Sequence, residues 1–341
     1  MEALLEDLFS GMNPFLLAVV VIVTIGALAK SADWLVDAAV ALSERSKIPK
    51  VVIGATIVSL GTTAPEAAVS VLAAVQGNPG LALGNAVGSI ICDTGLILGV
   101  ATLIAPLRLN RTIVNRQGWL QLAAGLALVI FSFPRSNPAA AFSTGGNLPQ
   151  LVGFVFLAAL VVYIFLSIRW ARQDADDLLP EEFEHDVEDS TPIILAKLIG
   201  SLALVLISAM VLIPAVSEAA RRMSIPESII AATMVAFGTS LPELVTAVKA
   251  SLRGHGELAV GNVIGADILN VLFVAGAAAA VTEGGLEADS QFFLVLFPTM
   301  IFILIVFRVG VIYSGESMKR PFGIVLIASY AFVTLVSYVL K

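Results

Sequence analysis

The sequence has few charged residues and almost no cysteine or histidine. Charged side chains make up 13% of its 341 residues, whereas hydrophobic residues make up 58%. Because a typical soluble domain has about 25% charged residues, this composition excludes an ordinary soluble globular protein. A single cysteine excludes an intramolecular disulfide, and it leaves the redox compartment open. We therefore predict an integral membrane protein.

The chain also lacks the motifs of several enzymes and pumps. It contains no G-x-x-x-x-G-K-[ST] phosphate loop and no polar stretch long enough for a nucleotide-binding domain. His185 and His255 lie in polar segments away from Ser240, which disfavours an intramembrane serine hydrolase, because that nucleophile needs an adjacent base. We expect no enzymatic activity, no cofactor and no nucleic-acid partner.

Long apolar runs dominate what is present. A helix needs about 20 apolar residues to cross a bilayer. These runs are continuous rather than alternating, which favours helices over barrel strands. The acidic start, MEALLEDLFSG, is unlike a signal peptide, so we expect the first run to remain in the mature protein. The predicted fold class is an all-α polytopic membrane protein with ten transmembrane helices, at about residues 14–40, 50–75, 80–105, 115–134, 150–171, 192–220, 227–252, 257–282, 289–310 and 320–340.

The distribution of lysine and arginine predicts the orientation of the chain. Short cytoplasmic loops carry an excess of these residues. When the N-terminus and the C-terminus are both placed outside, most of the lysine and arginine residues fall in cytoplasmic connections. The acidic segment 172–191 is then a cytoplasmic linker, and its charge is typical of a solvated segment.

Two segments of the chain are copies of each other. Residues 49–99 align without a gap on residues 226–276, with about 19 of the 51 positions identical. Five apolar runs separate each position from its twin, so the second copy must cross the membrane in the opposite direction. We predict two inverted five-helix halves, 1–171 and 192–341. Inverted repeats place a binding site near the middle of the membrane, where the two copies meet.

Each copy contains a polar motif inside an apolar run, G-T-T-A-P-E in the first and G-T-S-L-P-E in the second. Pro65 and Pro242 interrupt their helices and free the carbonyl about four residues earlier. A freed carbonyl within the membrane needs a partner or a hydrated cavity. Every ligand atom that the motifs offer is oxygen, which suits hard cations such as Ca²⁺ or Na⁺. The side chains that offer them are Thr62, Thr63, Glu66, Thr239, Ser240 and Glu243.

A second pair of motifs, GNAVGSIICD and GNVIGADILN, supplies further polar residues. Ser89 and Asp93 are four residues apart and share a helix face, as do Ala266 and Asn270. A carboxylate such as Asp93 in the middle of a span is a functional candidate, because it is costly unless paired or hydrated. No lysine or arginine lies at this depth to neutralise the acids, so bound cations are the simplest partners. Asp267 is either a further charge of the site or a hydrogen-bonded helix contact.

The paired G-T-[ST]-x-P-E and G-N-x-[VI]-G motifs resemble the α-repeats of the calcium/cation antiporter superfamily, particularly the prokaryotic sodium/calcium exchangers. This resemblance implies a ten-helix fold in which the first and sixth helices slide against the other eight. It also implies exchange of Ca²⁺ for Na⁺ by alternating access in a prokaryotic plasma membrane, normally extruding Ca²⁺, with no obligate protein partner.

The resemblance implies roles for individual residues. Glu66 and Glu243 would hold Ca²⁺ together with carbonyl oxygens of Thr62 and Thr239. Residues implied for Na⁺ or shared sites are Ser59, Thr63, Ser89, Asp93, Ala236, Ser240 and Asn270. The chain departs from the family in two respects. Asp93 and Asn270 are interchanged relative to the usual order, and Ala266 stands where the family usually has serine.

Three alternatives remain beside Na⁺-coupled exchange. Proton-coupled relatives typically carry glutamate after the G-N pair, which this chain lacks in both copies. Potassium-dependent relatives tend to have aspartate where Asn270 stands, although Asp93 keeps K⁺ coupling open. A Ca²⁺ channel would conduct without a counter-ion, and the residues alone do not separate it from an exchanger.

Overall fold

The computed structural model describes residues 2–135, 137–177, 189–223 and 238–339, and these are mostly helical. Four of the helical segments, η1, η2, η5 and η6, are π-helical, and η3 is a 3₁₀ turn. The segments in chain order are α1 (Glu2–Ser10), α2 (Pro14–Ser46), α3 (Lys50–Ile53), η1 (Gly54–Val58), α4 (Ser59–Thr62), α5 (Ala64–Val75), α6 (Pro79–Ile90), η2 (Ile91–Ile97), α7 (Leu98–Ile104), α8 (Arg111–Ser132), η3 (Pro138–Phe142), α9 (Gln150–Asp177), α10 (Thr191–Arg222), α12 (Leu241–Leu252), α13 (Gly256–Leu269), η5 (Asn270–Ala275), α14 (Gly276–Val281), η6 (Phe292–Leu296), α15 (Phe297–Ser314) and α16 (Arg320–Val339).

The helical class predicted from the sequence is confirmed, with one small addition. Strand β1 (Gly146–Leu148) pairs antiparallel with β2 (Leu286–Ala288) and joins two loops that the sequence did not predict to be paired. In the described residues, six helices are long and apolar enough to cross a membrane, or seven if a bent pair counts as one span. The count of ten remains a prediction, and residues 224–237, which include the start of the seventh predicted span, lie outside the described residues. Most of the predicted linker 172–191 lies outside them as well.

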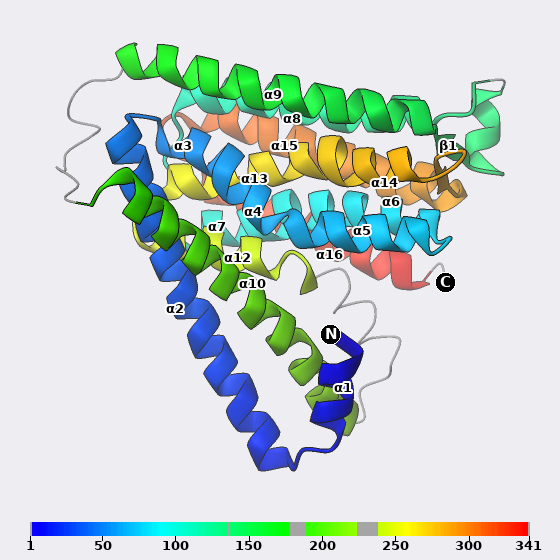
Figure 1. Cartoon of the computed structure of the whole chain (residues 1–341). Coiled ribbons are helices and arrows are strands. Elements are labelled where there is room, and N and C mark those ends of the chain that lie inside the picture. Colours follow the sequence, from blue (N-terminus) through cyan, green and yellow to red (C-terminus); the bar gives the residue numbers. More distant parts are fainter. Residues whose placement is uncertain (1, 136, 178–188, 224–237, 340–341) are drawn as a thin grey trace.

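Two long helices, α2 and α10, form a pair that stands apart from the rest. Figure 1 shows them crossing at an angle to the stack of helices that contains α5, α6, α8, α9, α13, α14 and α15. The C-terminal half of α2 is attached to α12 and the residue that follows it by ion pairs of Lys249 with Asp33, at 3.1 Å, and of Arg253 with Asp37, at 2.5 Å. The pair therefore contacts the stack through a limited set of elements.

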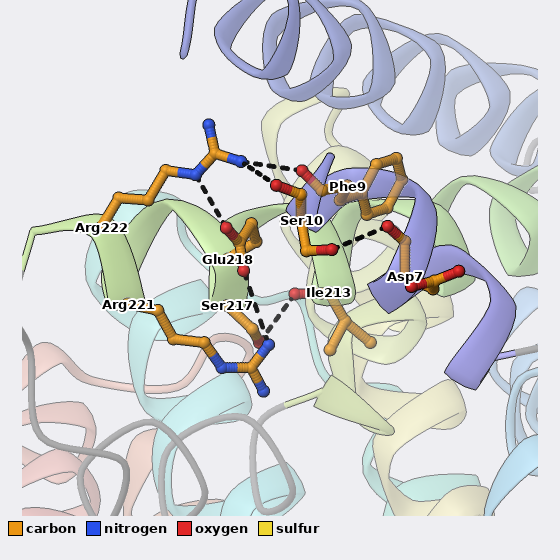
Figure 2. A network of polar contacts seen from close by, with 8 residues as sticks. All are labelled: Asp7, Phe9, Ser10, Ile213, Ser217, Glu218, Arg221 and Arg222. Carbon is orange, nitrogen blue, oxygen red and sulfur yellow. Dashed lines mark hydrogen bonds and ion pairs between the residues drawn. The ribbon is translucent and has the colours of Figure 1, made fainter. Parts of the chain in front are cut away.

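The short helix α1 holds α2 and α10 together at their other end. Phe9, Leu17 and Ala215, one from each helix, form a small buried cluster. Figure 2 shows Arg222 at the end of α10 donating to the carbonyl oxygens of Phe9 and Ser10, at 2.9 and 3.1 Å, and to Glu218 at 2.7 Å. Because those carbonyls belong to the last turn of α1, a cation there also complements the helix dipole. Helix α1 thus links the two long helices α2 and α10.

The first polar motif breaks its helix where the sequence predicts. The segments Lys50–Thr62 and Ala64–Val75 meet at an angle of 43°. Pro65 has no N–H, so the helix cannot continue its hydrogen-bond ladder through this point, and α5 begins afresh after Thr63. In the second motif, α12 begins after Ser240 with Pro242 in its first turn. The part of the predicted span before this break, up to residue 237, lies outside the described residues.

Helix α13 packs closely against α3 and η1 because glycines line the contact. A Cβ on Gly261 would meet the backbone of Val51, and a Cβ on Gly265 would meet the backbone of Ala55. Glycines four residues apart on one helix face allow such a close approach. This contact brings the second polar motif beside the first.

Candidate functional site: a buried oxygen-rich centre

The two motif glutamates lie at corresponding places in the two copies and are both buried. Glu66 is in the first turn of α5 and Glu243 in the first turn of α12, and each is 1% exposed. The N-terminus of a helix favours negative charge, because the dipole and the free N–H groups point toward it. The two carboxylates are close enough to interact electrostatically, and Thr63 Oγ1 donates to Glu243 Oε1 at 3.4 Å. The structure thus brings the two copies together at these residues.

Asparagines of the G-N pairs support the broken helices. Asn85 Nδ2 donates to the carbonyl oxygen of Glu66 at 3.3 Å and to Ser70 Oγ at 2.9 Å. In the other copy, Thr62 Oγ1 donates to Asn262 Oδ1 at 3.5 Å. Both asparagines are buried, and the sequence analysis did not select them. The repeat of G-N in register was the signal that could have identified them.

Asp93 and Asn270 contact each other at the centre of the molecule. Asn270 Nδ2 donates to Asp93 Oδ2 at 3.4 Å, and each side chain is 1% exposed. The two residues are separated by 177 positions, the same offset that relates Glu66 to Glu243. Twin residues touch when a two-fold axis relating the copies passes between them. Both lie in π-helical segments, η2 and η5, and such segments are frequent at functional sites.

The centre has more hydrogen-bond acceptors than the described residues satisfy. A buried acceptor without a partner costs free energy, and most buried polar groups in proteins have one. A hard cation satisfies several oxygens at once. Buried oxygens of this centre without a hydrogen-bond partner among the described residues include Glu66 Oε2, Glu243 Oε2, Asp93 Oδ1, Asn270 Oδ1, Thr239 Oγ1 and Ser240 Oγ.

The remaining predicted site residues are distributed around this centre. Ser59 and Ser89 are buried on α4 and α6, and Ser59 Oγ donates to the carbonyl oxygen of Thr56 at 3.4 Å. Thr239 is half-buried, and Ala236 lies outside the described residues. Within the described part of the chain, no three acidic, histidine or cysteine side chains form a ready-made metal cluster. The carboxylates of Glu66, Glu243 and Asp93, supplemented by hydroxyl, amide and carbonyl oxygens, are the available ligands.

Asp267 forms a hydrogen-bonded contact between helices, one of the two predicted alternatives. Its Oδ2 accepts from Thr94 Oγ1 and, at 2.5 Å, from Gln121 Nε2. Gln121 Nε2 also donates to Thr94 Oγ1, at 3.0 Å. Gln121 comes from α8, outside both repeats, and the sequence gave no signal for it.

These features define a class of protein. A polytopic bundle of apolar helices surrounds a buried, oxygen-rich and acidic centre, and ionisable groups at such depth are typical of ion pathways. This combination of fold and buried centre is typical of membrane transporters for ions.

Comparison with known proteins identifies the family. The family model for "sodium/calcium exchanger protein" matches residues 16–169 and 193–339. The sodium/calcium exchanger MaX1 of Methanosarcina acetivorans is 30% identical over 92% of this chain and 96% of its own length. The inner membrane protein YrbG of Escherichia coli is 31% identical over 84% of this chain and 89% of its own length. The chain belongs to the sodium/calcium exchanger protein family.

A solved structure supports the fold. The sodium-calcium exchanger NCX_Mj, soaked with zero Na⁺ and Ca²⁺, matches 94% of this chain and 98% of its own chain with a TM-score of 0.78. At 23% sequence identity, this likeness concerns the fold alone. Together with the family, it identifies an integral membrane protein whose named exchanger relatives are transporters rather than enzymes.

Proposed function

We propose that the chain is a secondary antiporter that exchanges Ca²⁺ for Na⁺ by alternating access and normally extrudes Ca²⁺. The observation that carries this proposal is the meeting of Glu66 and Glu243. These twin carboxylates come from opposite halves of the chain and are buried, and the hydroxyl of Thr63, from the copy that contains Glu66, donates to Glu243. In this proposal they bind Ca²⁺ together with backbone oxygens of Thr62 and Thr239.

Competition for the same carboxylates makes the transport an exchange rather than a leak. Glu66 and Glu243 are buried, and in the described part of the chain neither forms an ion pair with a lysine or arginine, so their charges need a cation. Moving uncompensated buried charges through a low-dielectric barrier is costly. The empty site therefore resists reorientation, whereas the site loaded with either Ca²⁺ or Na⁺ can change its exposure. Na⁺ would use a wider set of oxygens than Ca²⁺, namely those of Ser59, Thr63, Ser89, Asp93, Ala236, Ser240 and Asn270.

The proposed architecture consists of two inverted halves, 1–171 and 192–341, joined by the cytoplasmic linker 172–191. The contact between the twins Asp93 and Asn270 supports a two-fold axis through the site. The position of α2 and α10 beside the stack supports a motion of this pair relative to the other helices. The distribution of lysine and arginine supports both termini outside.

Flux measurements in proteoliposomes test this function against its alternatives. We expect ⁴⁵Ca²⁺ uptake to require Na⁺ on the opposite side and to stop when the Na⁺ gradient is removed. A requirement for K⁺ on the same side as Ca²⁺ would indicate a potassium-dependent exchanger. Uptake driven by a pH gradient without Na⁺ would indicate proton coupling. Uptake without any counter-ion would indicate a channel and would refute exchange.

Restoring a hydroxyl at position 266 tests the Na⁺ sites. Ala266 is fully buried in α13, one turn before Asn270, and stands where the family usually has serine. We expect Ala266→Ser to shift the Na⁺ dependence of Ca²⁺ uptake to lower concentration by roughly threefold, because one hydrogen-bonding oxygen contributes about 0.5–1.5 kcal/mol. The Ca²⁺ dependence in the absence of competing Na⁺ should change less. An unchanged Na⁺ titration would show that position 266 does not contribute to Na⁺ binding.

A further inference from the structure

Two ion pairs attach the C-terminal half of α2 to the end of α12. Lys249 Nζ donates to Asp33 Oδ2 at 3.1 Å, and Arg253 forms an ion pair with Asp37 at 2.5 Å. Arg253 also donates to the carbonyl oxygen of Asp33, at 3.0 Å. On each side of the contact the two residues are four positions apart, so both pairs form on one face. We call these four residues the α2–α12 latch.

The latch lies on the helix that begins with a proposed cation ligand. Glu243 is in the first turn of α12, and Lys249 follows about 9 Å further along the helix axis. Helix α2 packs against α12. In the predicted orientation, the latch end of α12 faces the cytoplasm. Movement of α2 away from α12 would therefore open a route from this end of the molecule toward Glu243.

The first copy has no counterpart of the latch. The repeat relates Lys249 and Arg253 to Leu72 and Gln76, which are exposed at the end of α5. Beyond Glu66, α5 contains no charged residue, so it cannot form ion pairs of this kind. If the two inverted copies made identical contacts, the two exposures of the site would by symmetry have equal free energies. The latch removes that equality.

We propose that the α2–α12 latch sets the balance between the two exposures of the cation site, by stabilising the state that is closed toward the latch end. This inference rests on the proposed function, because alternating access requires α2 to leave α12 in each cycle. Each solvent-exposed ion pair stabilises a contact by a factor of up to about five. The apparent affinity for an ion is proportional to the fraction of molecules whose site is accessible. Loss of the latch therefore raises the apparent affinity on the side that the latch closes.

Uptake of ⁴⁵Ca²⁺ into membrane vesicles of opposite orientation tests the two sides separately. In the double variant Lys249→Gln, Arg253→Gln, we expect the half-saturating Ca²⁺ concentration at the latch side to fall about fivefold. At the other side it should stay the same or rise. A change in the same direction at both sides would indicate a direct effect on Ca²⁺ binding, and no change at either side would mean that the latch has no influence. Either result would overturn the proposal.

A lysine on α10 provides the matched control. Lys197 forms an ion pair with Asp189, just before the same helix, so Lys197→Gln removes an exposed pair without affecting the α2–α12 contact. Both half-saturating concentrations should remain those of the wild type. Lys249→Gln and Asp33→Asn should give the same shift singly and together, because each removes the same pair. Fully additive shifts would show that the two charges act separately, and would contradict the latch.

Pulsed electron paramagnetic resonance tests the latch without any transport. Spin labels on Ser46→Cys, at the exposed end of α2, and Thr112→Cys, exposed near the start of α8, report the distance between the helix pair and the stack. Cys92 is 1% exposed and should not react with the label. We expect a second distance population to grow about fivefold in Lys249→Gln, Arg253→Gln.

The two measurements distinguish failure of the latch from failure of the proposed function. Identical distance distributions in the wild type and the latch variant would refute the latch, whatever ions the protein transports. A distance distribution that responds to the variant, in a protein that does not exchange Ca²⁺ for Na⁺, would support the latch and refute the exchange.

Discussion

Glu66→Gln and Glu243→Gln are each expected to abolish Na⁺-dependent Ca²⁺ uptake. Glutamine keeps the size of the side chain but removes one of the two negative charges that the proposed Ca²⁺ site contains. A pair of unit charges 4 Å apart is worth about 4 kcal/mol at an effective dielectric constant of 20. This corresponds to roughly a thousandfold loss of affinity, and the double charge of Ca²⁺ makes it larger. The measurement is ⁴⁵Ca²⁺ uptake into proteoliposomes with an imposed Na⁺ gradient.

A third glutamate provides the control for this experiment. Glu287 lies exposed on β2, away from the broken helices, so Glu287→Gln should transport at the wild-type rate. All three variants should elute as the wild type does in size-exclusion chromatography, because the substitutions preserve volume. A Glu66→Gln, Glu243→Gln double variant that still transports Ca²⁺ would defeat the assignment of the site.

Gly265→Ala is expected to destabilise the protein and disturb the site, whereas Gly200→Ala, at an exposed position of α10, is expected to do neither. A Cβ on Gly265 would meet the backbone of Ala55 and the hydroxyl of Ser59. Backbone atoms cannot move aside as a flexible side chain does, so α13 must shift away from η1. Inserting a methyl group into a packed contact typically costs about 1–3 kcal/mol.

Gly200→Ala provides the control for this substitution. Gly200 lies exposed on α10, and among the described residues no atom lies within 4 Å of the place that its Cβ would take. We expect Gly265→Ala to lower the melting temperature in detergent by several degrees, whereas Gly200→Ala should not lower it. Equal melting temperatures for the two variants would contradict the close contact of α13 with η1.

The features predicted correctly from the sequence are those that local chemistry or internal repetition determines. Pro65 removes a backbone donor wherever it occurs in a helix, so the break after Thr63 was predictable. The repeat related Glu66 to Glu243, and the structure places the two acids within electrostatic reach. Their role in binding cations remains a proposal.

Other features depend on contacts between segments that no sequence pattern relates. Gln121 donates to Asp267 from α8, which belongs to neither copy of the repeat. No sequence pattern around Gln121 therefore predicted this contact. Strands β1 and β2 pair with each other, but each has only three residues, which is too short to produce a periodic pattern in the sequence. The attachment of α1 to Arg222 depends on the arrangement of α2 and α10 in space.

The two copies also differ where a repeat predicts that they are alike. Asp267 stands where the first copy has Ile90, and it accepts hydrogen bonds from Thr94 and Gln121. The sequence shows this difference, but the partners of Asp267 depend on which helices lie beside α13.

Competitive binding is the most direct test of the central claim that one pair of glutamates serves both ions. Equilibrium ⁴⁵Ca²⁺ binding to the purified protein should be saturable in the wild type and fully displaced by Na⁺, with the apparent Ca²⁺ affinity falling as Na⁺ is raised. In Glu66→Gln and Glu243→Gln the same binding should be lost. Ca²⁺ that remains bound at saturating Na⁺, or that binds equally well to both glutamine variants, would contradict the account.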